Sequence, residues 1–580
     1  MIILGVHDGH NASACLLADG TVVAAHQEER LTRRKNQGGF PAQAIESVLR
    51  IAGLSLDRVD RVAYAGCLLS ALPSSSQAQR QGYKHNSRPA TALRDAFKST
   101  LVDRTRQAMI NNRRLSRVRE TGFHGPVEFV DHHTCHAAAA YHGWGRIDDD
   151  VLVLTLDGAG DRVCATVNIA RSGSLTRIAS VDESASIGIV WAVVTAMNGM
   201  VALEHEYKLM GLAPYAAREA SERIAERLAR AFRFVGDGLV WKLAAETPSS
   251  NRCYEHLRRL LEFERLDAVA GGLQLFTERF VSTWVRNCIN TTGFRNVALG
   301  GGVFMNVKLN KVVMELEEVE RLFVFPSCGD ETNPIGACYH LAAAAHAPIR
   351  PLRDLYWGPE FSCSEIKAAV NEHRFAAPVT LRETAQVEEE AAELLARGEI
   401  IGRFSGREEF GARSLGNRAL LAPPQSASSA QQLNEMIKQR DFWMPFALSI
   451  AEDRARDYLC NPKQLPAPYM IMCFDTSAAG AQMVAGIHPR DRTVRPQIVD
   501  AESNPAFYRL IKAYERLTGI GAVVNTSLNL HGEPLVSTPA DALRLFELSG
   551  LRHLALGNLM ISKREQLLNA TPGFGESLSA

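Results

Sequence analysis

The sequence predicts an α/β protein in which an amino-terminal part repeats one β-hairpin unit and a second α/β domain follows. Apolar runs flank a polar turn near the amino terminus, and the same arrangement recurs at residues 151–169. The segment 348–359 carries several prolines and no helical period, which is typical of a linker. A chain of 580 residues is also too long for a single hydrophobic core. We therefore expect roughly three or four folding units, or two large ones.

The composition is that of an ordinary globular protein. Hydrophobic residues make up 46% and charged residues 22%, and the 64 basic residues balance 64 acidic ones. Net charge therefore favours a small-molecule partner over nucleic acid or a membrane surface. Eleven cysteines without a C-x-x-C pair fit free thiols in a reducing compartment. No apolar run is long enough to cross a bilayer, and MIILGVHDGH is not a signal peptide, so we expect a cytoplasmic location.

The amino terminus predicts a β-hairpin followed by a third strand. Apolar residues 1–6 and 12–17 flank HDGHN, and Asp19-Gly20 precedes the run 21–25. The second copy at 151–169 contains an Asp157-Gly158 turn and then Asp161. In the fold of actin, sugar kinases and the large heat-shock chaperones, which this pattern resembles, such a hairpin opens each half and its turn wraps nucleotide phosphates. Asp157 is therefore a candidate nucleotide contact, although a single Asp-Gly turn between strands often serves only to reverse the chain.

The stretch VDHHTCHAAAAYHGW at 130–144 has metal-ligand spacing. If it is helical, His132 and His136 project from one face. Two histidines leave a divalent ion short of ligands, so a carboxylate must complete the site. Asp330 in SCGDET is the candidate, because it follows the predicted strand RLFVFP. Such a histidine pair is more often an ordinary core or surface pair, so spacing alone leaves the metal open.

The region 77–122 is rich in arginine and lysine, with few acidic residues. A basic patch could contact an anionic ligand or RNA. Only Tyr83 and Phe97 offer aromatic rings for stacking, which favours a solvated helical insertion instead.

Two further segments of the amino-terminal part carry candidate ligand contacts. Residues 187–215 begin as a core helix and end with Lys208, which either contacts phosphate or is a helix C-terminal cation before a capping Gly211. NVALGGGVFMN at 296–306 reads as a strand, a glycine turn and a helix, and its glycines would let the backbone approach a ligand closely. The candidate cofactor contacts in this segment are Gly300, Gly301, Gly302 and Asn306.

The carboxy-terminal part begins near residue 361, with a helix at 385–397 and a strand at 400–404. Short strand-to-loop segments then carry basic residues interleaved with Gly, Ser, Thr and Asn, as a pocket for phosphorylated ligands would. These residues are Arg407, Arg413, Arg418, Lys438, Arg440 and Arg495. Dispersed arginines are usually surface residues, so both interpretations stay open.

Several motifs in order resemble one known family. HHTCH, VALGGGVFMN, the GD loop, EFGARSLGNRALLA, IKQRDFWMPFA and VVNTSLNLHGEPLV are similar to the O-carbamoyltransferases, which include nodulation-factor, cephamycin and aminoglycoside carbamoyltransferases. The similarity runs from residue 2 to about residue 561. Independent motifs in the right order make this resemblance more specific than any single site.

The resemblance implies a domain plan and a reaction. It implies an actin-like ATPase-fold domain of two ribonuclease-H-like halves at 1–347, a linker at 348–360, a YrdC-like domain at 361–565 and a tail at 566–580. The YrdC-like domain would form carbamoyl adenylate from carbamoyl phosphate and ATP with Mg²⁺. The first domain would pass the carbamoyl group to a hydroxyl of a small-molecule acceptor, such as an antibiotic, toxin or glycoside, beside Fe²⁺ or a similar divalent ion.

The resemblance also implies residue roles. It places His132, His136 and Asp330 on the metal, His10 near the reacting carbonyl as a general base, and Gly301 with its neighbours around adenosine. Around carbamoyl phosphate and the nucleotide it places Arg413, Lys438, Arg495, Asn525 and Ser527. We count Arg413 and Lys438 as catalytic candidates, and Arg418 and Arg440 as further cofactor contacts.

Two departures from the family pattern affect this assignment. Many relatives have His-Asp where this chain has His10-Asn11, and others carry Arg where this chain has Met444. A threonylcarbamoyl transferase acting on tRNA and a non-catalytic nucleotide-binding scaffold remain alternatives. A hydrogenase-maturation carbamoyltransferase would carry zinc-finger cysteine pairs that this chain lacks. Three questions stay open, namely the acceptor, the metal and the oligomeric state, for which a homodimer is one alternative. We expect insertions such as 77–122 to shape the acceptor pocket.

Overall fold

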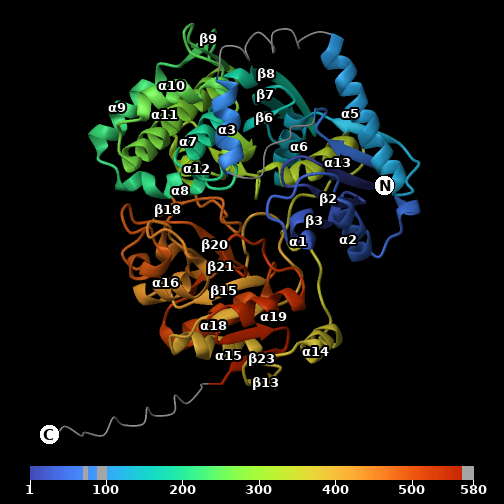
Figure 1. The fold of residues 1–580 in the computed structure, drawn as a ribbon, viewed down its shortest axis with the longest axis vertical. Helices are drawn as coiled ribbons and strands as arrows, with labels where there is room; N and C mark the ends of the chain where they lie inside the picture. Colours follow the sequence, from blue (N-terminus) through green and yellow to red (C-terminus); the bar gives the residue numbers. More distant parts are fainter. Residues whose placement is uncertain (69–75, 88–100, 565–580) are drawn as a thin grey trace, which may run out of the picture.

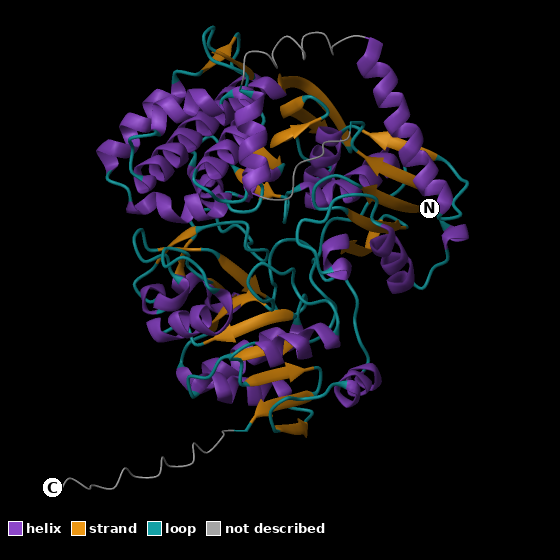
Figure 2. Ribbon diagram, in the orientation of Figure 1, coloured by secondary structure: helices purple, strands orange, loops and turns teal. Residues whose placement is uncertain are grey.

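The structure is a computed structural model that describes residues 1–68, 76–87 and 101–564, and side chains in the second and third ranges from 78 and 107 onward (Figure 1). The predicted tail at 566–580 and Phe97 lie outside the described residues. The α/β class predicted from the sequence is confirmed, with helices packed around three large sheets (Figure 2). None of the described helices combines the length and apolar character needed to cross a membrane.

The first sheet has five strands in the order β3-β2-β1-β4-β5. They are β1 (Ile2–His7), β2 (Ser13–Ala18), β3 (Thr21–Gln27), β4 (Arg61–Ala65) and β5 (Val127–Val130). The first three are antiparallel, and β4 and β5 run parallel to β1. The predicted first hairpin and third strand are confirmed, and Asp19 and Gly20 both have positive φ, as a tight hairpin turn requires.

The second sheet repeats this topology. Its order is β12-β11-β6-β7-β8. Strands β6, β7 and β8 are antiparallel, and the later strands β11 and β12 run parallel to β6. The strands are β6 (Val151–Gly160), β7 (Val163–Arg171), β8 (Ser174–Asp182), β11 (Asn296–Gly300) and β12 (Arg321–Val324). The predicted repetition of the hairpin unit is therefore confirmed at the level of strand order and direction.

The turn predicted at Asp157-Gly158 is wrong in position. Gly160 pairs with Val163, so the chain reverses at Asp161-Arg162, and both of these residues have positive φ. The ladder is irregular between Leu156 and Gly160. Asp157 stays on the strand side of the turn, which leaves its carboxylate free to face helix α6.

Two helices lie between the two sheets and pack against each other (Figure 1). They are α6 (His132–Trp144) and α13 (Asn333–Ala344). Their contact is close because α6 is rich in alanine and α13 has Gly336, where an added Cβ would lie 1.8 Å from the carbonyl oxygen of Cys135. This close packing fixes the first turns of both helices near one another.

Further helices cover the outer faces of these sheets and their connections. They are α1 (Glu28–Thr32), α2 (Ala42–Ala52), α3 (Ser76–Asn86), α5 (Leu101–Glu120), α7 (Ile187–Met197), α8 (Glu206–Leu212), α9 (Arg218–Ala229), α10 (Tyr254–Leu261), α11 (Leu266–Thr292) and α12 (Val307–Glu315). A small hairpin joins β9 (Phe232–Val235) to β10 (Val240–Leu243). The described part of the basic region 77–122 is largely helical, as predicted, in α3 and α5. Gly211 lies inside α8, so the predicted capping role of Gly211 is wrong.

The third sheet has eight strands in the order β13-β23-β22-β14-β15-β21-β16-β20. They are β13 (Val379–Glu383), β14 (Ile401–Phe404), β15 (Arg418–Ala422), β16 (Ala447–Ala451), β20 (Pro496–Val499), β21 (Ala522–Ser527), β22 (His553–Leu556) and β23 (Leu559–Lys563). Helices α15 (Val387–Ala396) and α18 (Pro505–Thr518) pack on one face, and α19 (Pro539–Leu548) packs on the other. The smaller elements are α14 (Cys363–Glu372), α16 (Ala427–Leu433), α17 (Ala455–Tyr458), β17 (Leu459–Cys460), β18 (Phe474–Thr476) and β19 (Thr493–Val494).

Segment 348–360 contains no helix or strand, but it is not a loose tether. Trp357 is buried, and its carbonyl accepts a hydrogen bond from the backbone N–H of Ala25 on β3. The guanidinium of Arg407 donates to the same carbonyl. The eight-stranded sheet is thus anchored to the first sheet through this segment.

Candidate active site

Helix α6 presents two imidazoles from its first turn. Asp131 caps the helix by accepting the backbone N–H of Thr134 at 2.9 Å, so the helix begins at His132. One turn later, His136 projects from the same face, and the two Nε2 atoms lie 3.1 Å apart. Both side chains are almost fully buried.

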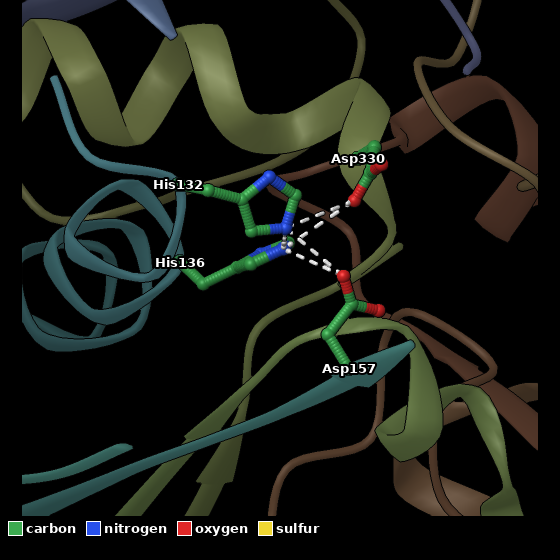
Figure 3. Close-up of side chains that lie close together, drawn as sticks. All are labelled: His132, His136, Asp157 and Asp330. Atoms are coloured by element: carbon green, nitrogen blue, oxygen red, sulfur yellow. Dashed lines mark hydrogen bonds and ion pairs between the residues drawn. The ribbon is translucent and has the colours of Figure 1, made fainter. Parts of the chain in front are cut away.

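Two carboxylates converge on these nitrogens (Figure 3). Oδ1 of Asp330, at the start of the turn that leads into α13, lies 3.5 Å from Nε2 of each histidine. Oδ2 of Asp157, from β6, lies 2.9 Å from Nε2 of His132 and 3.7 Å from that of His136. The four ligand atoms all lie within 4.8 Å of one another. We call these four residues the His/Asp cluster.

The spacing in the His/Asp cluster fits one divalent ion. Ligand bonds of about 2.1 Å place neighbouring ligand atoms about 3.0–3.4 Å apart around an ion, close to the separations observed here. Two imidazoles with two carboxylates suit Fe²⁺, Mn²⁺ or Zn²⁺ and do not select among them.

The surroundings hold Asp157 and His132 in this arrangement. The second oxygen of Asp157, Oδ1, accepts the backbone N–H of Gly302 at 2.9 Å. Asp161 accepts the backbone N–H of His132 at 2.7 Å. Gly160 lies against the His132 ring, where an added Cβ would come within 2.1 Å of ring carbons. Such outer contacts orient metal ligands in known sites.

Between the two cluster histidines, His133 has a structural role. Its Nδ1 lies 2.7 Å from Oγ1 of Thr155 and its Nε2 lies 2.9 Å from the carbonyl oxygen of Val163. Burial, together with the neighbouring imidazoles, lowers the pKa of His133 to about 3. It stays neutral and belongs to the core.

The electrostatics of the His/Asp cluster favour a cation. Burial works against a charged imidazole, but Asp330 and Asp157 outweigh it and raise the pKa of His132 to about 9. The pKa of His136 is raised for the same reason. Burial alone would raise the pKa of both carboxyl groups, yet the histidines hold the pKa of Asp157 and Asp330 below the usual value. Two carboxylates thus attract positive charge, whether it is a proton or a metal ion.

A second group lies on the loops around the eight-stranded sheet. It consists of four cations, Arg413, Lys438, Arg440 and Arg495, which we call the basic cluster. Burial and then mutual repulsion lower the pKa of Arg413 and Arg495. Within the described part of the chain, the buried Nε atoms of these two arginines have no hydrogen-bond partner. Buried guanidinium groups without a carboxylate are typical of an anion site.

Lys438 is held in place by the protein. Its ammonium donates to Oδ1 of Asn529 at 2.6 Å and to Oγ of Ser527 at 3.1 Å. Burial and the nearby Arg440 lower its pKa. Arg440 donates to Oγ1 of Thr526 at 3.1 Å and stacks on Phe446, with 5.0 Å from the guanidinium carbon to the ring centroid.

One cavity of about 1100 Å³ contains both groups. Its walls include His132, Asp157 and Asp330 at the His/Asp cluster, and Arg413 and Arg495 at the basic cluster. The other predicted site residues that line it are His10, Lys208, Gly302, Asn306, Lys438, Arg440 and Ser527. Lys208 forms an ion pair with Asp441 at 3.1 Å, which bridges α8 and the loop after Lys438.

Other predicted site residues lie outside the walls of this cavity in the described structure. Arg418 is buried in β15, with its guanidinium over the Phe404 ring and donating to backbone carbonyls. The side chain of Asn525 is buried and hydrogen-bonded to Ser449 and Gln497. Gly300 and Gly301 instead allow β11 to approach helix α6 and β6 closely.

Sequence reasoning missed that Asp157 belongs with the histidines. The sequence predicts a nucleotide contact for Asp157 instead, and the signal that was available is an Asp at the end of an apolar strand. Asn529, which holds Lys438, was also missed, although it stands in the VVNTSLNLHGEPLV motif.

Comparisons with known proteins agree with one another over most of the chain. The family model "Carbamoyltransferase N-terminus" matches residues 2–339, and "Carbamoyltransferase C-terminus" matches residues 392–563. The chain is 30% identical to nodulation protein NolNO of Sinorhizobium fredii over 96% of this chain and 79% of that protein. It is 28% identical to the uncharacterized protein sll1178 of Synechocystis sp. over 96% of both. Among solved structures, T. kodakarensis HypF matches at 13% identity with a TM-score of 0.33, over 60% of this chain and 48% of that chain.

Proposed function

Because this chain belongs to the carbamoyltransferase family, we propose that it is an ATP-dependent O-carbamoyltransferase with two reaction sites in one cavity. The basic cluster forms carbamoyl adenylate from carbamoyl phosphate and ATP. The His/Asp cluster is where the carbamoyl group passes to a hydroxyl of a small secondary metabolite. The cavity that contains both clusters is the observation that carries this proposal.

The proposal includes the domain plan. The two repeated sheets form an actin-like domain at 1–347, and the eight-stranded sheet belongs to a YrdC-like domain at 361–565, with 348–360 as a packed linker. The described cysteines are all free thiols, which supports a cytoplasmic location.

The first step needs positive charge. Carbamoyl phosphate loses its phosphate to water, and an oxygen of the resulting carbamate displaces pyrophosphate from the α-phosphorus of ATP with Mg²⁺. Arg413, Arg440 and Arg495 offset the negative charge of the phosphates, and Lys438 sits fixed at the same wall. Nitrogen lone-pair donation makes carbamate a poor acyl donor, so adenylation supplies the leaving group.

The second step joins the acceptor hydroxyl to the carbamoyl carbon. The hydroxyl oxygen attacks, the bond to AMP breaks, and the hydroxyl proton moves to a general base, for which His10 lies in the cavity wall. A divalent ion bound by the His/Asp cluster would supply Lewis acidity toward the carbamoyl oxygen. Asp157 and His132 are held by Gly302 and Asp161, so the site is preorganised. Because both clusters line one cavity, the adenylate has a short path to the His/Asp cluster, which limits its exposure to water.

The test measures two activities separately. With ATP and carbamoyl phosphate alone, the protein should release pyrophosphate. With a panel of hydroxylated metabolites added, mass spectrometry should find a product that has gained one carbamoyl group. Absence of both pyrophosphate release and carbamoylated product would overturn the proposal.

A further inference from the structure

We propose that Ser327 is a positioning residue that places Arg413 for the adenylate-forming step, and that two residues near the end of β3 assist it. These two are Gln27 and Arg30. All three precede residue 348, whereas Arg413 lies on the loop between β14 and β15 of the eight-stranded sheet. The inference rests on the proposed function and deepens it, because it names what holds one cation of the basic cluster at the phosphates.

The position of Arg413 depends on its backbone. Its side chain is buried, and within the described part of the chain its Nε atom has no hydrogen-bond partner. The neighbouring Arg440 repels its guanidinium, which helps to lower the pKa of Arg413. A buried cation without fixed partners is free to shift. The two residues before it, Gly411 and Ala412, therefore decide where it lies.

The hydroxyl of Ser327 holds the residue directly before Arg413. Its Oγ accepts the backbone N–H of Ala412 at 2.9 Å and donates its own hydrogen to the carboxylate of Glu331. Because a hydroxyl carries one hydrogen, donation to Glu331 leaves its lone pairs for Ala412. Ser327 is buried, so this bond forms away from competing water.

Two further residues hold Gly411. Oε1 of Gln27 accepts the backbone N–H of Gly411 at 3.2 Å, and Arg30 donates from Nη2 to the carbonyl of Gly411 at 2.5 Å. Arg30 also lies 3.5 Å from the carboxylate of Glu408, on the same loop. Three polar backbone groups in a row, up to the N–H of Ala412, are thus bonded to residues from outside the eight-stranded sheet.

The backbone of both turns allows this close contact. Gly411 has a φ of 95°, and an added Cβ would lie 2.5 Å from Cβ and Oγ of Ser327. Ser327 itself has a φ of 52°, in a region that residues other than glycine rarely adopt. Such a conformation persists where the surrounding structure fixes it, and it is frequent at functional sites.

The turn that holds the Arg413 loop also carries a residue of the His/Asp cluster. Asp330 stands between Ser327 and Glu331 in the sequence, and Oγ of Ser13 donates to the backbone carbonyl of Glu331 at 2.8 Å. The basic cluster is therefore complete only when the His/Asp cluster is assembled beside it. Under the proposed function, the adenylate, which reacts readily with water, is then not made where nothing can use it.

The experiment is a double-mutant cycle between Ser327→Gly and Arg413→Ala, measured on pyrophosphate release. Glycine removes the hydroxyl and adopts a φ of 52° without steric cost, so the turn is not strained. We expect Ser327→Gly to lower kcat roughly 10–100-fold with a smaller change in the KM for ATP, because misplacing a group that acts in the transition state mainly lowers kcat. In the Arg413→Ala background, Ser327→Gly should have little further effect.

Ser172→Gly is the matched control. Ser172 also has a positive φ, of 47°, and lies on the exposed turn between β7 and β8, so this variant should have wild-type activity. Gln27→Met is a second variant, which removes the acceptor for the N–H of Gly411 and should show the same dependence on Arg413. Melting temperatures check that each variant is folded, and metal content should equal wild type.

Equal losses from Ser327→Gly in the wild-type and Arg413→Ala backgrounds would overturn the proposal, because Ser327 would then support the fold in general. Wild-type kcat in both Ser327→Gly and Gln27→Met would also overturn it. The same cycle is measured on binding of inorganic pyrophosphate by calorimetry, where Ser327→Gly should weaken binding only while Arg413 is present. Absence of pyrophosphate release in wild type would count against the proposed function, and the binding cycle would then decide the role of Ser327 on its own.

Discussion

Nε2 of His132 lies 2.9 Å from Oδ2 of Asp157, although the first residue belongs to the helix that follows the first sheet and the second to the first strand of the second sheet. Asp330, which leads into α13, completes the arrangement from a third direction. The His/Asp cluster therefore exists only when both sheets and the two helices between them are assembled.

Replacing His132 by Ala should remove metal binding and carbamoylation of the acceptor while pyrophosphate release continues, because the basic cluster is untouched. Metal content after dialysis and the two activity assays measure this. The matched control is His133→Asn, which breaks core hydrogen bonds to Thr155 and Val163. It should cost about 1–3 kcal/mol of stability and keep the metal. Joint loss of both activities in the His132 variant would argue against separate sites.

Asp157→Asn tests whether the cluster has four ligands. The asparagine can still accept the N–H of Gly302 but loses one negative charge at the histidines. Metal affinity should fall by more than the roughly 10–100-fold that is typical when a residue that only hydrogen-bonds to a metal ligand is replaced. Competition with a fluorescent chelator measures the dissociation constant. Affinity equal to wild type would remove Asp157 from the ligand set.

Metal binding should release protons. The pKa of His132 is raised from 6.5 to about 9 in the metal-free protein, so at pH 7.5 its imidazole is protonated and an ion must displace that proton. Apparent affinity should therefore rise with pH and level off above about pH 9. The stability that protonated His132 gives the metal-free fold is fully present below pH 6.5 and is lost as pH rises through about 9.

Calorimetry in buffers with different ionisation enthalpies counts the protons released per ion. Zero release at pH 7.5 would contradict the raised pKa of His132. A chemically matched comparison is Asp330→Asn, which removes one of the carboxylates that raise this pKa and should shift the affinity profile to lower pH.

Arg413→Ala should strongly slow adenylate formation. Loss of one buried cation at the phosphates should slow pyrophosphate release roughly 10²–10³-fold, with metal content unchanged. Arg509→Ala is the control, because Arg509 lies on helix α18, which packs on the eight-stranded sheet, and its side chain is more than half exposed. A normal rate in the Arg413 variant would remove this residue from the site.

Arg114→Met should destabilise the protein by about 3–5 kcal/mol, because it leaves the buried carboxylate of Asp8 without its partner. Adding Asp8→Leu should restore much of the loss. Chemical unfolding measures both variants. Arg117→Ala, on the exposed side of the same helix, should leave stability near wild type. Equal stability of the Arg114 and Arg117 variants would show that the Asp8 pair contributes nothing.

The sequence predicted the elements that depend on local pattern. The first hairpin, α7 and the helix bearing His132 follow from apolar periodicity and turn residues, which are local properties. Spacing also placed His132 and His136 on one face, and a strand end suggested Asp330. These interpretations needed no knowledge of packing.

Other features depend on which way a side chain faces after folding. Arg413 and Arg418 stand five residues apart in one motif, yet Arg413 lies on a loop at the cavity, whereas Arg418 enters β15 and stacks on Phe404. Asp157 joins the histidines only because the reversal of the chain falls at Asp161-Arg162. Neither outcome can be derived from spacing, because each depends on contacts between distant segments.

The size of the shared cavity has a kinetic meaning. One molecule confined to about 1100 Å³ has a local concentration on the order of 1 M. A short-lived intermediate made at one end would thus meet its reaction partner at a level that free diffusion through the cell could never sustain. Under the proposed function, the shared cavity would let a fragile compound be used close to where it is made.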